Sequence, residues 1–198
     1  MTNKNLRLET IDRFFQTLAA EWPHPTQILL IGGAVALIVG SNRTTEDIDF
    51  EATLDRGARW EDFEATLRKI EEGLKIRLQF SESIERWSMI SFLDYTRHRV
   101  PYKRYGKINA TFLKPSYWAI GKVSRYLDQD VQDMVLVFLK DKTDPVRLAK
   151  LWRRALDESP DSSQLFNVKK QMSHFFKTHG PGIWGKSLPL DKILPLFK

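Results

Sequence analysis

The sequence predicts an α+β fold, with an α/β core at residues 1–114 and a C-terminal helical subdomain at residues 115–198. Two observations support this division. Up to about residue 113, segments with alternating apolar residues are interleaved with segments that have helical apolar spacing, which is typical of strands and helices packed together. After Pro115 the spacing is helical throughout. A chain of 198 residues suits one core with a helical appendage.

The elements of the core follow from the spacing of its apolar residues. Helical spacing predicts an amphipathic helix at the N-terminus, ended by Pro23 and Pro25. Short apolar or alternating runs predict the strands. In order, we expect a helix at 5–21, a strand at 28–31, a short helix at 34–39, a strand at 47–50, a helix at 58–73 with Gly73 as its C-cap, and strands at 75–80, 89–95 and 108–113.

The second part of the chain is predicted to be helical from Pro115, which suits the first turn of a helix. The expected helices cover 115–126, a following segment with Asp130 and Asp133, 144–156, 161–178 and a short leucine-rich stretch near 190–197. We expect the last of these to dock on the body of the protein or on a partner.

Two aspartates stand one residue apart after a Gly-Gly turn. Asp47 and Asp49 belong to an alternating run, so both carboxylates leave the predicted strand on the same face, with Cα atoms about 6.6 Å apart. They are close enough to converge on a divalent cation. Gly32 and Gly33 let the backbone turn sharply and approach a ligand. The structural alternative is a tight strand-to-helix turn beside a solvated strand edge.

The turn and the acidic strand together resemble the signature of the nucleotidyltransferase superfamily, in particular its AbiEii/AbiGii toxin-like branch. The matching residues are Gly32, Gly33, Arg43, Thr45, Asp47 and Asp49. The resemblance implies a nucleotidyltransferase-like mixed β-sheet flanked by helices. It also implies that the glycine turn, with Arg43 and Thr45 nearby, binds the phosphates of an NTP, while the aspartates hold Mg²⁺ or Mn²⁺.

Members of this superfamily use a third carboxylate from a later strand beside the Asp-x-Asp strand. Asp94 is the acid within the apolar run SFLDY and is our first candidate for the metal site; Glu82 is the alternative. Two Mg²⁺ ions need bridging oxygens that two side chains rarely supply alone. Toxin-like relatives often show Lys-x-Asp at this step, whereas this chain has Phe92-Leu93-Asp94.

A second segment, LKPSYWAIGKVSRYLDQDVQDMVLV, resembles another motif of the same branch. Its matching residues are Lys122, Arg125, Asp130 and Asp133, with each pair at i, i+3 on one helix face. Two interpretations stay open. In the first, Lys122 contacts nucleotide phosphate, and Asp130 or Asp133 orients that phosphate or the acceptor. In the second, the two pairs form a buried salt bridge between helices.

The positive charge is concentrated in the second half of the chain. Residues 1–99 carry 13 Lys and Arg against 16 Asp and Glu, and residues 100–198 carry 18 against 9. This asymmetry favours a polyanion such as RNA or tRNA as a partner of the second half. The basic and aromatic stretch 97–107, expected to be a hairpin, could also contact a nucleotide or an RNA strand. Solvated basic surfaces are the alternative in both cases.

Composition excludes several other classes. The chain has no cysteine, so a disulfide scaffold or thiolate chemistry is ruled out, and a cytoplasmic protein is expected. Its longest apolar run, 28–39, is too short to cross a membrane.

The function expected is therefore a Mg-dependent nucleotidyltransferase that moves NMP from an NTP to a hydroxyl on RNA, protein or a small molecule. The resemblance implies a toxin with a possible antitoxin protein as partner. The alternative is a catalytically inactive module on the same fold that binds nucleotide, RNA or a protein.

Overall fold

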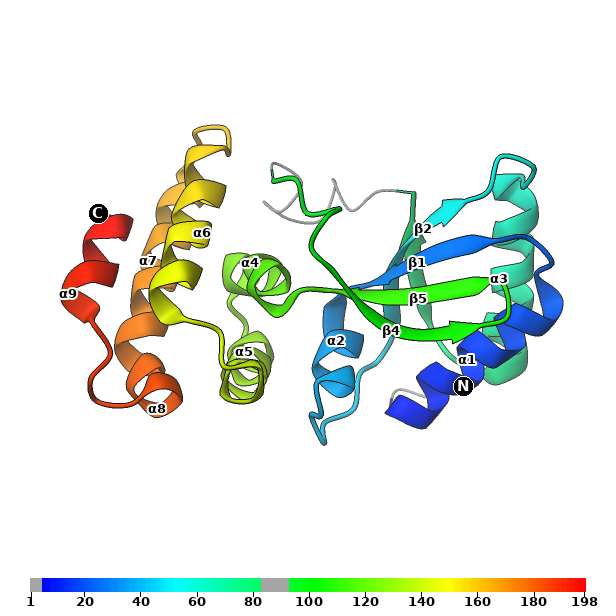
Figure 1. Cartoon of the computed structure of the whole chain (residues 1–198), viewed down its shortest axis with the longest axis horizontal. Helices are drawn as coiled ribbons and strands as arrows, with labels where there is room; N and C mark the ends of the chain where they lie inside the picture. The colour runs from blue at the N-terminus through cyan, green and yellow to red at the C-terminus, as the bar shows by residue number, and fades with distance from the viewer. Residues whose placement is uncertain (1–4, 83–92) are drawn as a thin grey trace. The chain divides into compact units, whose positions relative to one another are not determined.

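The computed structural model describes residues 5–82 and 93–198. It has an α+β fold, as predicted (Figure 1). The chain divides into two compact units. The first comprises the described residues up to 82 together with Arg99–Leu113, and the second comprises residues 93–98 and Lys114–Lys198. All strands of the described part belong to the first unit, and the second is helical.

The first unit is built on a mixed sheet with the strand order β3-β2-β1-β5-β4. The strands are β1 (Thr26–Leu30), β2 (Ile48–Leu54), β3 (Leu78–Ser81), β4 (Arg99–Tyr105) and β5 (Ile108–Leu113). The central strand β1 pairs antiparallel with β2 and parallel with β5. Outside this centre, β3 runs parallel to β2, and β4 and β5 form an antiparallel hairpin. The mixed character of the sheet is therefore confirmed.

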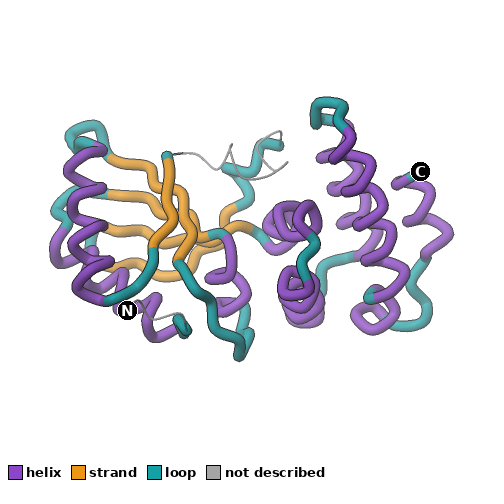
Figure 2. Tube along the Cα trace, turned by 180° about the vertical axis from the view of Figure 1, so that it is seen from behind, coloured by secondary structure: helices purple, strands orange, loops and turns teal. Residues whose placement is uncertain are grey.

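Two helices of the first unit, α1 (Leu8–Glu21) and α3 (Trp60–Leu74), pack side by side on one face of this sheet (Figures 1 and 2). The ring of Phe14 on α1 lies 5.7 Å from that of Phe50 on β2. Because side chains alternate along a strand, Asp49 and Glu51 point to the opposite face. The short helix α2 (Gly32–Ile38) follows β1 directly and contacts β2.

The hairpin β4–β5 is attached to α1 through one carboxylate. Asp12 accepts hydrogen bonds from the hydroxyl of Tyr102 at 2.6 Å, from Nζ of Lys103 at 2.6 Å and from the hydroxyl of Tyr105. Burial alone would raise the pKa of Asp12, but these donors lower it below its usual range. Burial and the Asp12 carboxylate raise the pKa of both tyrosines. The hairpin is present as predicted, and three of the side chains considered for nucleotide contact bind Asp12.

Several element boundaries differ from the predicted ones. Helix α2 begins at Gly32 and not at residue 34, so both glycines lie in its first turn, and β3 begins at Leu78 and not at residue 75. Asp47, predicted within a strand, lies just before β2.

Two further local predictions differ from the structure. The strand expected at 89–95 is wrong for residues 93–95, which form a bend and extended backbone outside the sheet, while 89–92 lie outside the described residues. The C-cap of α3 is Lys75, which adopts a left-handed conformation with φ of 55°, and Gly73 lies inside the helix. The helix continues past Gly73, and its last carbonyls are satisfied beyond it: the backbone N–H of Lys75 donates to the carbonyl of Glu72 at 3.3 Å, and that of Ile76 donates to the carbonyl of Glu71 at 3.1 Å.

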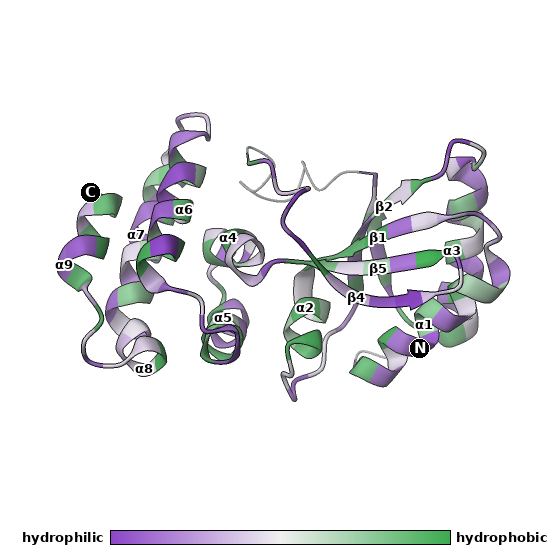
Figure 3. Ribbon diagram, viewed as in Figure 1, coloured by the Kyte–Doolittle hydropathy of each residue, from purple (hydrophilic) through white to green (hydrophobic). Residues whose placement is uncertain are grey.

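The helices of the second unit surround an aromatic core. They are α4 (Pro115–Arg125), α5 (Asp128–Asp141), α6 (Pro145–Asp157), α7 (Ser163–Thr178), α8 (Gly180–Trp184), α9 (Leu190–Ile193) and the 3₁₀ helix η3 (Leu194–Phe197). Trp152 on α6 is fully buried against Phe175 and Phe176 of α7. Phe197 stacks on Phe176 at 5.9 Å, so the C-terminal segment docks on this unit. Apolar and polar residues alternate around these helices (Figure 3).

No helix among the described residues is long and apolar enough to cross a membrane.

Candidate nucleotide and metal site

The glycine turn lies directly against the carboxylate of Asp49. Gly32 has a left-handed backbone with φ of +60°, and a Cβ placed on it would come within 1.7 Å of Oδ2 of Asp49. The backbone N–H of Ile31, just before the turn, donates to the carbonyl of Asp49 at 2.9 Å. Only glycine allows both the conformation and this approach. The fold therefore brings together two motif residues that are 17 positions apart.

The second glycine makes a similar approach to Thr45. A Cβ on Gly33 would lie 2.3 Å from Oγ1 of Thr45. Thr45 is buried and held by Leu6, with which it forms an isolated antiparallel bridge through N–H···O bonds of 2.8 and 3.1 Å. The half-buried Arg43 lies on the same loop, where its backbone N–H donates to Oγ of Ser41. The bridge between Thr45 and Leu6 was not predicted from the sequence.

Asp47 stands just before β2 and contacts the neighbouring strand. Its Oδ2 accepts a hydrogen bond from Nε2 of Gln79 at 2.7 Å. Gln79 is paired with Asp49 in the parallel register of β2 and β3. Asp47 and Asp49 are both half-buried, and Gln79 is a neighbour of both. The first unit thus groups two carboxylates, one amide and the two close glycines.

A third acid continues the same face of β2. Glu51 follows Asp49 at i+2 and is only 5% exposed. Its Oε1 forms an ion pair with Nη2 of Arg99 at 3.4 Å. Continuing the alternation from Asp47 and Asp49 by one more step would have identified this residue in the sequence. In the structure Glu51 pairs with Arg99 of β4. The alternating pattern of acids in the sequence does not reveal this cationic partner.

The donor set of this site suits a hard divalent cation. Mg²⁺ and Mn²⁺ prefer oxygen ligands, and Asp47 and Asp49 offer carboxylate oxygens two residues apart in the sequence. The glycines leave room for backbone approach where any side chain would collide with Asp49 or Thr45. In residues 5–82 and 93–198, no group of three or more acidic or histidine side chains is arranged to hold a metal ion.

Asp94, the first candidate for a third metal ligand, belongs to the second unit. It is exposed, and its carboxylate accepts from Oγ1 of Thr96 at 2.7 Å and pairs with Nε of Arg97 at 3.3 Å. The hydrogen bond from Thr96 and the charge of Arg97 lower the pKa of Asp94. Glu82, the alternative, is an exposed residue just beyond β3. A metal-binding role for either acid stays a prediction.

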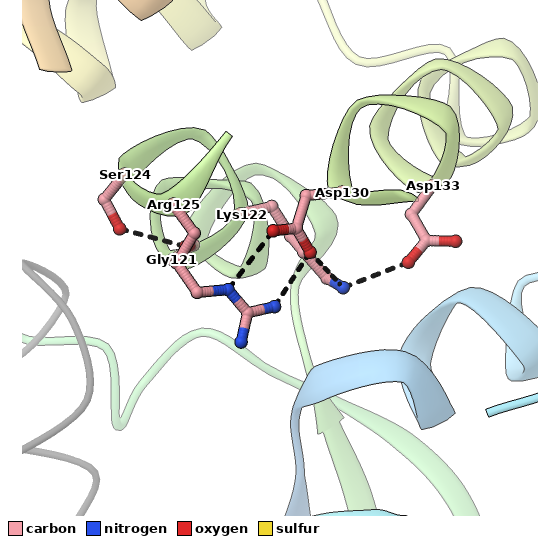
Figure 4. Close-up of polar contacts among 6 residues, drawn as sticks. All are labelled: Gly121, Lys122, Ser124, Arg125, Asp130 and Asp133. Carbon is pink, nitrogen blue, oxygen red and sulfur yellow. Dashed lines mark hydrogen bonds and ion pairs between the residues drawn. The ribbon is translucent and has the colours of Figure 1, made fainter. Parts of the chain in front are cut away.

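Lys122 lies within an ion-pair network between α4 and α5 (Figure 4). Its Nζ donates to Asp130 at 2.8 Å and to Asp133 at 3.0 Å, and all three residues are nearly completely buried. Arg125 adds two hydrogen bonds to Asp130, at 3.2 and 2.8 Å. Burial opposes ionisation of Asp130, but Arg125 and Lys122 lower its pKa below the usual value. The salt bridge considered from the sequence is present; phosphate binding by Lys122 stays a prediction.

The comparisons with known proteins leave the site to be interpreted from its geometry. The chain matches no protein-family model, no curated protein and no solved structure.

Proposed function

We propose that the chain is a Mg²⁺-dependent nucleotidyltransferase of the AbiEii/AbiGii toxin-like kind, with its nucleotide site at the glycine turn and Asp47 and Asp49. The approach of Gly32 to the Asp49 carboxylate is the observation that carries the proposal. It supports a single site in which backbone and acid act on one ligand, because an ordinary strand-to-helix turn does not need a glycine pressed against a carboxylate. The mixed sheet is consistent with such a fold.

The reaction proposed is transfer of NMP to a hydroxyl. The hydroxyl oxygen forms a bond to the α-phosphorus of the NTP, the bond from that phosphorus to the oxygen bridging to the β-phosphate breaks, and pyrophosphate leaves. One carboxylate of the Asp47 and Asp49 pair accepts the hydroxyl proton. The backbone at Gly32 and Gly33 seats the triphosphate, and Asp47 and Asp49 hold the cation. Bound Mg²⁺ supplies neutralisation of the phosphate charge.

Labelled NTPs test this reaction and distinguish it from phosphoryl transfer. The acceptors to be tried, each with Mg²⁺, are tRNA, total RNA and the protein itself. The α-³²P label of an NTP should become acid-insoluble, whereas a γ-³²P label should not. Asp47→Asn and Asp49→Asn should remove the incorporation. Asp55→Asn is the matched control, since Asp55 is an exposed acid just beyond the other end of β2. Equal incorporation by the wild type and both site variants would disprove the proposal.

One observation favours a second candidate, a nucleotide-binding module without turnover. The strand next to β2 carries Gln79 where it is paired with Asp49, and Leu78–Ser81 contains no acid. In a catalytic site of this kind, a carboxylate at that position would supply further oxygen ligands for the metal ion. Mg²⁺-dependent NTP binding without any transfer of the α-³²P label to the acceptors would support this candidate over the enzyme.

The acceptor and the biological partner are proposed from charge and from the resemblance. Arg147 and Lys150 are exposed one turn apart on α6, in the basic half of the chain, and suit the phosphates of RNA or tRNA. A toxin role with an antitoxin partner follows from the resemblance alone. Growth arrest on expression of the wild type, absent with Asp49→Asn, would support it.

A further inference from the structure

Gln79 is placed to control the geometry of the acidic pair. It lies on β3, parallel to β2, and its Nε2 reaches Oδ2 of Asp47 at 2.7 Å. The contact joins residues 32 positions apart in the sequence. It therefore depends on the pairing of β2 with β3.

The hydrogen bond between Gln79 and Asp47 can form in only one direction. An ionised carboxylate only accepts hydrogen bonds, so the amide of Gln79 must present its NH₂ group to Asp47. Such a bond restricts the rotamer of the carboxylate without adding negative charge. A carboxylate at the same position would add charge and further oxygen ligands beside Asp47, at the cost of repulsion when no cation is bound.

We propose that Gln79 is a positioning residue that orients Asp47 for binding of the divalent cation. This inference rests on the proposed function of the Asp47 and Asp49 site. Groups that hydrogen-bond to metal ligands fix their orientation, and losing such a group typically weakens metal binding at least about tenfold. Gln79 also sets the charge of the site, because it supplies an amide where the neighbouring strand could have supplied an acid.

Binding of Mn²⁺ alone, followed by the electron paramagnetic resonance signal of the free ion, tests the inference without nucleotide or turnover. Gln79→Leu should raise the Mn²⁺ dissociation constant about tenfold. Gln79→Glu loses the same donated hydrogen bond but adds a negative charge beside Asp47, so its dissociation constant should lie below that of Gln79→Leu. Gln27→Leu is the matched control: Gln27 is also an exposed strand glutamine in an amide contact, here with Asn109, and it pairs with Thr53, far along β2 from Asp49. Its affinity should equal that of the wild type.

The outcomes separate this inference from the function on which it rests. Unfolding temperatures in EDTA identify any variant that fails to fold, and Gln79→Met, which keeps the length of the side chain without its amide, then replaces Gln79→Leu as the test of positioning. If Asp49→Asn abolishes Mn²⁺ binding but Gln79→Leu, or Gln79→Met in its place, binds like the wild type, the positioning role is wrong and the site remains. If the wild type binds no Mn²⁺, or binds it as Asp49→Asn does, the proposed function is wrong and this inference falls with it.

Discussion

Gly32 carries two constraints in one residue. Its φ of +60° is a conformation that side chains other than glycine rarely adopt, and the space that a Cβ would fill holds the carboxylate of Asp49. The first constraint comes from the backbone conformation of the turn, and the second comes from the close approach to Asp49. A residue that satisfied only the turn, such as asparagine, would still displace Asp49.

Replacing Gly32 by alanine should therefore damage stability and binding together. We expect Gly32→Ala to lower the free energy of unfolding by about 1–3 kcal/mol, because the left-handed backbone is strained and Asp49 must move. Denaturant unfolding measures this loss. Binding of NTP with Mg²⁺ should weaken at least about tenfold, since the displaced carboxylate is a proposed metal ligand.

The control for this substitution is Gly57→Ala. Gly57 lies in the turn after β2, and a Cβ there meets nothing within 4 Å. Its binding should match the wild type. Nucleotide affinity unchanged in Gly32→Ala would show that the turn and Asp49 do not act on the same ligand.

At the scale of elements, the local features of this chain were predictable and the pairings were not. The hairpin β4–β5 and the start of α4 at Pro115 follow from residues adjacent in the sequence. The alternation of acidic and apolar residues also matches the burial of Ile48 and Phe50 on either side of the half-buried Asp49. By contrast, the contact of Gln79 with Asp47 requires β3 to lie beside β2. No periodicity within either strand specifies that neighbour.

In the candidate site, the strand predicted around Asp94 failed for the same reason: its pairing could not be predicted from the sequence. A short apolar run with one acid predicted a strand, but a short run does not specify which segment it will pair with. In the structure its described part, residues 93–95, forms a bend and extended backbone, and a turn follows at Thr96 and Arg97, whose side chains both contact the carboxylate of Asp94. The local hydrogen bond from Thr96 to Asp94 is typical of turns, and it competes with strand formation.

The ion-pair network between α4 and α5 should make stability sensitive to acid. The pKa of Asp130 is lowered in the folded protein, so its contribution is complete above its unfolded value near 3.8 and is lost as pH falls through the folded value. At pH 7 we expect Asp130→Asn to cost about 3 kcal/mol, because Lys122 stays buried with one partner fewer. Below pH 4 the difference from the wild type should shrink.

Denaturant unfolding between pH 2 and pH 7 measures both effects. Asp128→Asn serves as the control, since Asp128 lies in the first turn of the same helix and is exposed. It should change stability by less than about 1 kcal/mol. A constant difference between Asp130→Asn and the wild type over the whole pH range would contradict the assignment of the acid sensitivity to Asp130.

At the scale of the whole molecule, charge is divided between the two parts of the sequence. The excess of basic residues after residue 100 accounts for the net charge of +6. Some of these cations are paired within their own helix, as Arg154 is with Glu158 at 2.7 Å. The exposed Arg147 and Lys150 on α6 are the pair to which we assign phosphate contacts.

Salt dependence of RNA binding tests that assignment. Removing two phosphate contacts with Arg147→Ala and Lys150→Ala together should reduce the slope of log K against log salt concentration by about 1.4 on a single-stranded RNA. Titration of a labelled oligonucleotide at several salt concentrations gives the slope. Arg68→Ala with Lys69→Ala removes the same charge from α3 and should leave the slope unchanged. Equal slopes for both double variants would exclude α6 as the contact.

The central claim is that the glycine turn and the acidic pair form one metal-dependent nucleotide site. Thermal unfolding with NTP, with and without Mg²⁺, tests it most directly. At NTP concentrations about 100 times the dissociation constant, binding should add about 2.7 kcal/mol and raise the unfolding temperature by about 5 °C or more. EDTA, Asp47→Asn and Asp49→Asn should each abolish the shift, and Asp55→Asn should retain it. A shift that persists in EDTA or in both aspartate variants would contradict the account.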